Sequence, residues 1–215
     1  ASERWKKKID WKNYINFVIL KLNSIKKDLK KHKLKVAIEN HQDFDSHELK
    51  HIIKKVGKDV IGINFDIGNS FATCENPMQF AKNLSPYILN VHIKDYKVLK
   101  CSNGFILKRC PIGSGNVDFK KVLFFLGKNS PKAKYAIELG SLDDRKILCN
   151  KKYFWKHFIY DKKQKKDYIK KLLDKNKKIS KNIENPWKKS ISAKSIVNYE
   201  KEELKQSINF LKKIL

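Results

Sequence analysis

The order of short apolar runs and polar residues constrains the fold of this chain more than any other feature. Four such runs predict β-strands over about residues 34–39, 60–66, 88–93 and 134–139. Each run carries, at or near its end, a side chain that can bind a metal ion: Glu39, Asp66, His92 and Glu138. Helix-like segments separate the runs, and the second run is almost wholly apolar, as expected for a parallel strand buried on both faces. The chain is therefore predicted to be an α/β protein whose polar strand ends meet at one edge.

Helical periodicity and capping residues predict the rest of the chain. The expected helices cover about residues 10–31, 45–57, 76–84, 119–126, 153–173 and 195–215. Asp10, Asp45 and Asn76 stand where three of these helices begin, which is where capping side chains occur. Residues 95–111 are expected to form a long loop with a small excursion at 104–107.

Composition limits the function classes. The chain has 215 residues, enough for one domain with a sizeable core. Its formal net charge is +27, but only Arg4, Arg109 and Arg145 among its 49 basic residues are arginine. Because nucleic-acid recognition usually depends on the guanidinium fork, we interpret this charge as a bias of composition and do not favour a nucleic-acid partner. No apolar run reaches the ~18 residues of a membrane span, and no signal peptide is visible, so a cytoplasmic protein without membrane contact is expected.

The four residues at the strand ends indicate one kind of chemistry. Two glutamates, one aspartate and one histidine form a mixed oxygen and nitrogen set, which suits Mn²⁺, Mg²⁺, Co²⁺ or Zn²⁺ and leaves positions for a substrate. The four cysteines are scattered, without a pair spaced two to four residues apart, so neither a disulfide framework nor a thiolate zinc site is expected.

Five short motifs resemble one known family. They are ENH at 39–41, NFDIGN at 64–69, HIKD at 92–95, PIGSG at 111–115 and IEL at 137–139. Together they resemble the sugar phosphate isomerase/epimerase family of the xylose-isomerase-like TIM barrels (the AP endonuclease 2 superfamily). The resemblance implies a (β/α)8 barrel fold, of which the four strands would be the last four. The whole of 1–215 is then expected to be one domain without its N-terminal half: a lead-in and helix at 1–33, four strand–helix units at 34–140, and C-terminal helices at 141–215.

The resemblance also implies roles for individual residues. The divalent metal would be held by Glu39, Asp66, His92 and Glu138. The two glutamates would also be the catalytic residues, moving a proton to and from the carbon next to a carbonyl through a cis-enediolate, while the metal polarises the substrate oxygens. His41, Asn69 and Lys94 would contact or orient the substrate, a small sugar, sugar phosphate or related polyol. In an extended segment His41 would point the same way as Glu39.

Two alternatives stay open beside the isomerase or epimerase. One is a DNA-repair nuclease like endonuclease IV, although Asn69 stands where several family members carry a histidine ligand. The other is an inactive half-barrel that is completed by a second copy of the chain or by a missing N-terminal half-barrel. At the PIGSG motif, Gly113 and Gly115 could cradle a phosphate or form a plain tight turn. The substrate, the metal and the oligomeric state cannot be assigned from the sequence.

Overall fold

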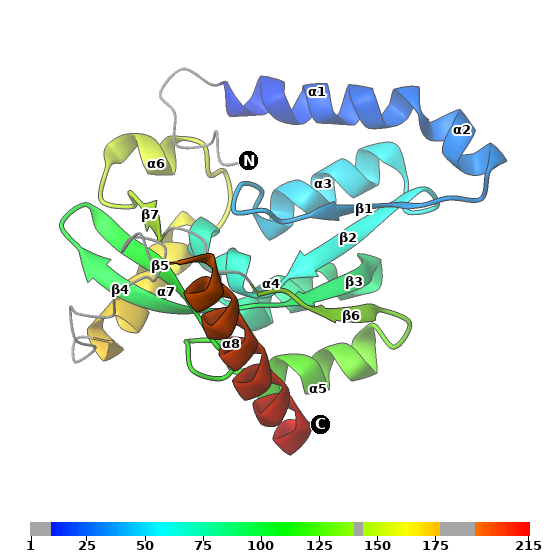
Figure 1. Cartoon of the computed structure of the whole chain (residues 1–215). Helices are drawn as coiled ribbons and strands as arrows, with labels where there is room; N and C mark the ends of the chain where they lie inside the picture. Colours follow the sequence, from blue (N-terminus) through cyan, green and yellow to red (C-terminus); the bar gives the residue numbers. More distant parts are fainter. Residues whose placement is uncertain (1–9, 140–143, 177–191) are drawn as a thin grey trace.

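A four-stranded parallel sheet forms the centre of the molecule (Figure 1). The computed structural model describes residues 10–139, 144–176 and 192–215. The sheet has the order β1-β2-β3-β6, with β1 at Val36–Glu39, β2 at Ile61–Asp66, β3 at Ile88–Ile93 and β6 at Lys134–Ile137. All three pairs of neighbours are parallel, which confirms the predicted α/β class. Since the strand order follows the chain order, the four strand ends predicted to carry ligands lie next to one another at one edge.

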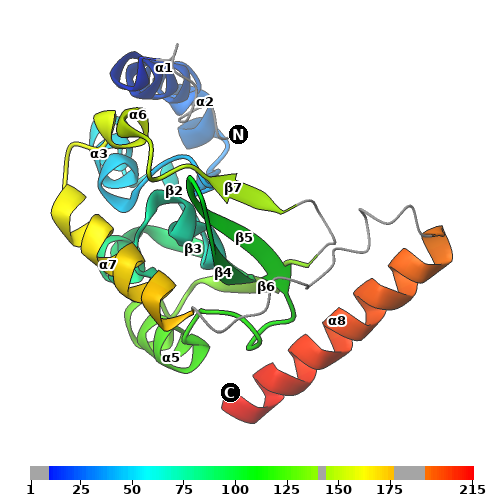
Figure 2. The same ribbon diagram turned by 90° about the vertical axis from the view of Figure 1, so that its left-hand side faces the viewer.

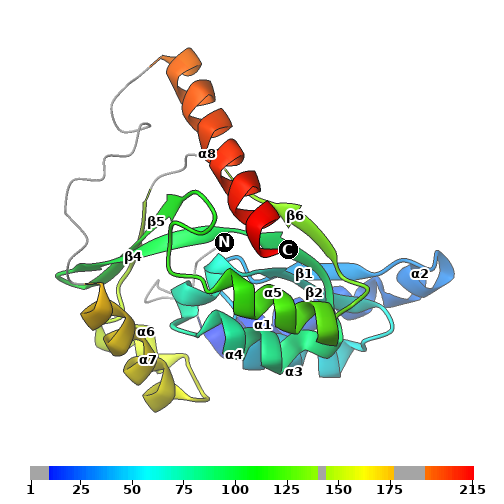
Figure 3. The same ribbon diagram turned by 90° about the horizontal axis from the view of Figure 1, so that it is seen from below.

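Helices cover one face of this sheet, and three of them lie side by side in the view from below (Figure 3). The covering elements are α1 (Trp11–Ser24), α2 (Lys26–Lys31), α3 (Ser46–Val56), α4 (Pro77–Leu84) and α5 (Phe119–Asn129). Two short 3₁₀ helices flank α4: η2 (Gly68–Thr73) and η3 (Ser85–Tyr87). The helix faces bury apolar side chains against β2, and Phe65 of β2 stacks on Phe80 of α4 with ring centres 5.0 Å apart. Burial of these side chains supplies the main stabilisation of the sheet.

The predicted helix starts agree with the caps in the structure. Asp10 and Asn76 each accept hydrogen bonds from two backbone N–H groups in the first turn of α1 and α4. Asp45 and Glu48 form a reciprocal capping box at the start of α3. The single helix expected over residues 10–31 is interrupted, because the chain leaves regular helical geometry at Ile25 and α2 begins as a separate helix.

The predicted loop over residues 95–111 is wrong. These residues form an antiparallel hairpin of β4 (Asp95–Cys101) and β5 (Gly104–Cys110), and β7 (Arg145–Ile147) adds a third strand. In β4, Tyr96 and Val98 flank Lys97 in alternation, and the two-residue turn Ser102-Asn103 is followed by Gly104, a spacing typical of a hairpin. The alternation covers only part of β4, and β5 contains the continuous apolar run Phe105-Ile106-Leu107, so periodicity alone did not predict the hairpin. Strand β7 was likewise not predicted, because its segment was expected to hold only helices.

Three further helices surround the hairpin: α6 (Lys152–Lys156), α7 (Lys162–Lys175) and α8 (Ala193–Ile214). Figure 2 shows α7 and α8 on opposite sides of it. The hydroxyl of Ser207 on α8 accepts a hydrogen bond from Ile112 N at 3.0 Å, so α8 is attached to the loop that follows β5. Among the helices of the described residues, none combines the length and the apolar stretch needed to cross a membrane.

Candidate metal centre

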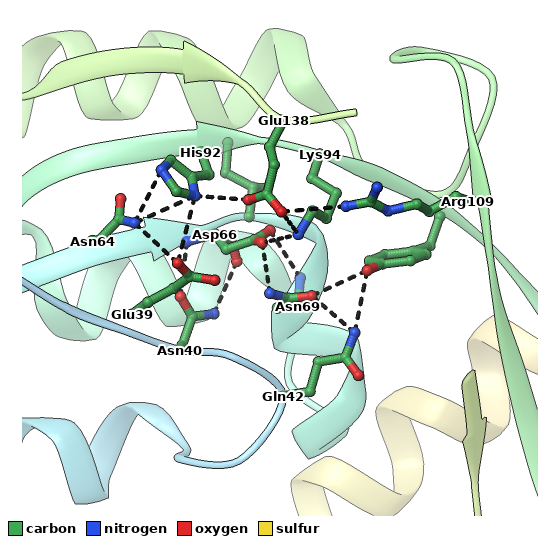
Figure 4. Close-up of polar contacts among 12 residues, drawn as sticks. Glu39, Asn40, Gln42, Asn64, Asp66, Asn69, His92, Lys94, Arg109 and Glu138 are labelled. Carbon is green, nitrogen blue, oxygen red and sulfur yellow. Dashed lines mark hydrogen bonds and ion pairs between the residues drawn. The ribbon is translucent and has the colours of Figure 1, made fainter. Parts of the chain in front are cut away.

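The four predicted ligands come together at the carboxyl end of the parallel sheet (Figure 4). One ligand atom from each of Glu39, Asp66, His92 and Glu138 can be chosen so that all four lie within 4.8 Å of one another. Asp66 and His92 are direct partners in the register of β2 and β3, so their side chains leave the sheet on the same side. Glu39 comes from the end of β1 and Glu138 directly follows β6, so the two glutamates approach from the two outer strands.

Asp66 is fully buried and is paired with a lysine. Lys94 Nζ lies 2.6 Å from Asp66 Oδ2, and both side chains are almost inaccessible to solvent. Burial raises the pKa of Asp66 to about 7, although the nearby Lys94 charge opposes this. Burial alone would lower the pKa of Lys94, but the electrostatic effects of Asp66 and Tyr96 and the hydrogen bonds to Asp66 and Glu138 together outweigh it, and the pKa lies above its ordinary value. The lysine is therefore protonated at neutral pH and places a positive charge among the carboxylates.

Glu138 lies at the junction of the metal cluster and the hairpin. Its Oε1 is 2.5 Å from Lys94 Nζ and 3.3 Å from Arg109 Nη2. Burial opposes ionisation of Glu138, but the hydrogen bond and charge of Lys94, together with the charge of Arg109, hold its pKa below the usual value. Its Oε2 lies 2.7 Å from His92 Nδ1 without making a hydrogen bond, so this buried carboxylate oxygen has no hydrogen-bond partner. Glu138 is consequently a carboxylate with one oxygen tethered by Lys94 and Arg109 and the other facing His92 inside the cluster.

Two asparagines hold the ligands in place from within the sheet. Asn40 and Asp66 exchange two hydrogen bonds of 2.8 Å, between the Asn40 amide and the Asp66 backbone, which join the ends of β1 and β2. Asn64 Nδ2 lies 3.3 Å from Glu39 Oε2 and 3.1 Å from His92 Nε2. Because Asn64 precedes Asp66 by two residues on β2, it faces the same side of the sheet.

Asn69 supports Asp66 through a fixed amide. Its Nδ2 donates to Asp66 Oδ2 at 2.5 Å. Its Oδ1 accepts from Gln42 Nε2 at 3.0 Å and from the Tyr96 hydroxyl at 3.2 Å. Burial raises the pKa of Tyr96, which keeps this hydroxyl protonated. Asn69 therefore orients a predicted metal ligand and serves it as a hydrogen-bond donor.

The backbone at His41 forms a turn, whereas the predicted substrate contact of this residue assumed an extended chain. The expectation assumed an extended chain after Glu39, but Gln42 N donates to Asn40 O at 2.9 Å and closes a three-residue turn centred on His41. His41 is half-buried, and its Nδ1 is enclosed without a hydrogen-bond partner. Its role as a substrate contact stays a prediction.

The donor set fits a divalent cation. Three carboxylates and one imidazole provide the oxygen and nitrogen ligands that Mg²⁺, Mn²⁺ or Zn²⁺ accept. The enclosed Oε2 of Glu138 makes no hydrogen bond and faces His92 Nδ1 at 2.7 Å, so two of the ligand atoms already point at one another. The ammonium of Lys94 already stabilises positive charge between Asp66 and Glu138, so the site is electrostatically suited to a cation.

Sequence reasoning missed five polar neighbours of the cluster: Asn40, Gln42, Asn64, Tyr96 and Arg109. Asn64 had a usable signal, since it is a polar residue on the same strand face as Asp66. Tyr96 and Arg109 are direct partners across the β4–β5 hairpin, so only a prediction of that pairing could have placed them side by side. Gln42 has a left-handed backbone with φ of 67°, which nothing in the sequence indicates.

The PIGSG motif does not cradle an external phosphate in this structure. The N–H groups of Gly113 and Gly115 donate to Asp95 Oδ2 at 3.0 and 2.9 Å, and Val117 N donates to Asp95 Oδ1 at 3.2 Å. The backbone donors that would bind a phosphate are therefore occupied by a carboxylate of the same chain, and the tight-turn alternative is correct.

Comparison with known proteins agrees with this fold. Residues 4–140 match the family model of the xylose isomerase-like TIM barrel, and the chain belongs to this family. This confirms the resemblance and places the parallel sheet as part of a (β/α)8 barrel.

Two curated relatives match parts of the chain. The uncharacterized protein YihM of Escherichia coli is 34% identical over 109 residues, covering 49% of this chain and 33% of YihM. The 3-oxo-isoapionate decarboxylase of Pectobacterium atrosepticum is 21% identical over 100 residues, covering 46% of this chain and 36% of that enzyme. The chain thus spans about a third of the length of each relative.

A solved structure shares the fold. It is a xylose isomerase-like TIM barrel protein from Mycobacterium smegmatis in complex with magnesium, with a TM-score of 0.50 and 14% identity. The match covers 75% of this chain and 51% of that protein. At this identity the likeness supports the fold alone.

Proposed function

We propose that this site catalyses proton transfer on a small sugar, sugar phosphate or polyol as a divalent-metal-dependent isomerase or epimerase. The observation that carries the proposal is the placement of two glutamates on the outer strands of the sheet, with Asp66 and His92 between them. Such a pair can serve the two faces of one substrate carbon. Membership of the xylose isomerase-like family supports an enzyme that modifies a sugar-like substrate.

The two glutamates have different surroundings. Glu138 is bonded by Lys94 and lies beside Arg109, and its lowered pKa keeps it ionised at neutral pH. An ionised carboxylate can accept the proton from the carbon next to the carbonyl. Glu39 is held only through Asn64 Nδ2 at 3.3 Å and lies 3.6 Å from His92 Nδ1. We assign Glu138 as the group that removes the proton and Glu39 as the group that delivers a proton, taken up from solvent, to the enediolate, while the proton on Glu138 is released to solvent.

The metal would be held by the same four residues, Glu39, Asp66, His92 and Glu138. When bound, a divalent cation supplies polarisation of the substrate carbonyl and hydroxyl oxygens. Lys94 and Arg109 provide N–H donors on the side of Glu138, where they can hold a substrate oxygen while Glu138 accepts the proton.

Glutamine substitution at the two glutamates tests this assignment. In the protein with its metal, Glu39→Gln and Glu138→Gln should each lower turnover by about 10²-fold or more, because loss of general acid–base catalysis typically costs that much. Exchange of the substrate C–H proton with deuterium from solvent, followed by NMR, separates the two roles. Glu39→Gln should still release the proton to solvent, whereas Glu138→Gln should not. Turnover that survives in both variants would overturn the mechanism.

Asn69→Gln provides a matched control at the edge of the cluster, because it keeps the amide. It should reduce turnover less than either glutamate variant. The DNA-nuclease alternative receives no support from the site, since Asn69 serves Asp66 as a hydrogen-bond donor. Cleavage of DNA containing an abasic site by the purified protein would restore that alternative.

A further inference from the structure

A basic hollow lies away from the metal cluster, between the tip of the β4–β5 hairpin, the segment that leads into α6, and α7. It has a volume of about 660 Å³, within the range of small-molecule sites. Five lysines line it: Lys100, Lys151, Lys152, Lys166 and Lys170. Trp155, Ile169 and Leu173 contribute apolar surface to the same lining. The single acidic residue of the lining is Asp174, so the hollow carries a net charge of +4.

The positive charge of this hollow is not a simple consequence of the lysine-rich chain. A second hollow beside α4 and α7 is lined by three carboxylates, Glu75, Asp118 and Asp161, against two lysines. A third, beside α1, is lined by two carboxylates and two lysines. In a protein of net charge +27, these two hollows are acidic or balanced while the first is strongly basic. Its lysines are therefore concentrated around one volume.

The walls of the basic hollow are fixed to one another by hydrogen bonds. Asn150 N donates to Asn103 O at 3.1 Å, and Asn150 Nδ2 donates to Ser102 O at 3.3 Å, which ties the segment before α6 to the hairpin turn. Asn176 Nδ2, at the end of α7, donates to Val98 O of β4 at 2.9 Å. Hence the lysines project from a framework that is already formed, and binding need not order it.

Trp155 gives the hollow an aromatic surface in a defined orientation. Its Nε1 donates to Cys149 O at 2.6 Å, and its ring packs against Phe154 and Phe158 with centres 5.0 and 5.6 Å away. Lys166 Nζ lies 5.2 Å from the centre of the Trp155 ring. A ligand that matches these features has several negative charges for the lysines and a planar ring for the indole.

We propose that this hollow binds a nucleoside polyphosphate, with the phosphates among the lysines and the base against Trp155. Lysines bind phosphate as point charges, without the planar fork that base-edge recognition uses. A strand of nucleic acid needs a track of positive charge, whereas these lysines surround a single volume. The ligand would contact the turn end of the β4–β5 hairpin, whereas Tyr96 and Arg109 lie at the opposite end. The proposed binding does not depend on the proposed sugar chemistry.

Calorimetric titration of the full chain with ATP tests the proposal, in about 150 mM salt to screen non-specific attraction. EDTA is included so that metal-bound ATP cannot occupy the carboxylate cluster. ATP should bind about tenfold more tightly than inorganic triphosphate, because stacking of one base contributes ~1–3 kcal/mol. Trp155→Leu should abolish this preference.

Two double variants distinguish binding of ATP in the hollow from non-specific attraction of ATP to a positively charged protein. Lys166→Gln/Lys170→Gln, at two exposed positions on α7, should weaken ATP binding by about tenfold or more. Lys54→Gln/Lys55→Gln removes the same charge from the exposed face of α3 and should leave the affinity within about twofold. Equal weakening by both pairs, or the absence of ATP binding, would overturn the proposal. So would a single-stranded oligonucleotide that binds more tightly than ATP at equal phosphate concentration, since it would identify a nucleic-acid surface.

Discussion

At the scale of single residues, Lys94 has the most informative surroundings. It belongs to the HIKD motif, follows His92 by two positions, and its ammonium bridges the fully buried Asp66 and the half-buried Glu138. Two carboxylates therefore share one protonated lysine, and Arg109 adds a second positive charge beside Glu138. A bound divalent metal and Lys94 would neutralise the same charges, so the stability of the fold and the affinity for metal are linked at this residue.

Lys94→Met should expose this link. The substitution leaves Asp66 without its buried partner, and breaking such a pair costs about 3–5 kcal/mol of unfolding free energy. Urea denaturation with EDTA should show this loss, and addition of Mn²⁺ should restore more stability to Lys94→Met than it adds to the unaltered protein. Lys54→Gln, on the solvent side of α3, serves as a control without effect. Equal stabilisation of both proteins by Mn²⁺ would contradict the link.

Because burial raises the pKa of Asp95, the stability of the fold should depend on pH. Burial raises the pKa of Asp95 from its ordinary value to about 6, although its carboxylate accepts hydrogen bonds from four backbone N–H groups. The folded state thus binds a proton more readily than the unfolded state. The contribution of Asp95 is fully present below about pH 4 and is lost as the pH rises through about 6, by roughly 3 kcal/mol in all.

Asp95→Asn removes this titration and also replaces one acceptor oxygen by a donor that faces N–H groups. The variant should be less stable at every pH, because backbone donors are left unsatisfied. The gap between the two proteins should narrow as the pH rises from about 4 to 7. Urea denaturation of both proteins at several pH values measures the gap, and a gap that widens with pH would show that the carboxylate is stabilised in its charged form instead.

At the scale of elements, the sequence predicted what is determined locally. The bounds of β3 agree with the prediction. The start of α3 was also predicted, because the capping box that begins this helix, Asp45 and Glu48, lies within four consecutive residues of the sequence. The hairpin depends on pairing across a turn and on the addition of the distant strand β7, neither of which periodicity alone reveals. Arg109 reaches Glu138 only through that pairing, which is why the ligand set could be predicted and its neighbour could not.

The hairpin turn requires glycine at position 104. Gly104 has φ of 146°, and an added Cβ would collide with the Ile147 carbonyl. Gly104→Ala should therefore destabilise the fold by more than about 1 kcal/mol and loosen the hairpin that carries Arg109. Gly127→Ala is the matched control: Gly127 lies in α5 with open space around its Cβ position, so alanine should stabilise the helix by about 0.5–1 kcal/mol. Thermal denaturation of the two variants distinguishes these outcomes, and equal effects would show that the turn does not depend on glycine.

At the scale of the whole molecule, the parallel sheet has two open edges within the described residues. β1 pairs only with β2, and β6 pairs only with β3. The side chains of β1 are half-buried, and those of β6 are mostly exposed. Closed barrels have no such edges, because each outer strand finds a partner. Unpaired backbone groups along β1 and β6 can bind further strands, whether from a second copy or from additional parts of a longer protein.

Self-association of this chain should consequently depend on salt. The open edges favour pairing, whereas the net charge of +27 opposes the approach of two copies. Raising the salt from about 50 to 500 mM shortens the screening length and should shift the sedimentation profile toward dimers or larger species.

Tyr135→Lys adds a charge to the exposed edge strand β6 and should reduce this association, since charged edges discourage pairing. Phe124→Lys adds the same charge on the exposed face of α5 and should have a smaller effect. A monomer at both salt concentrations would mean that the edges are protected by other parts of the chain, and the sheet would then not need a partner to complete it.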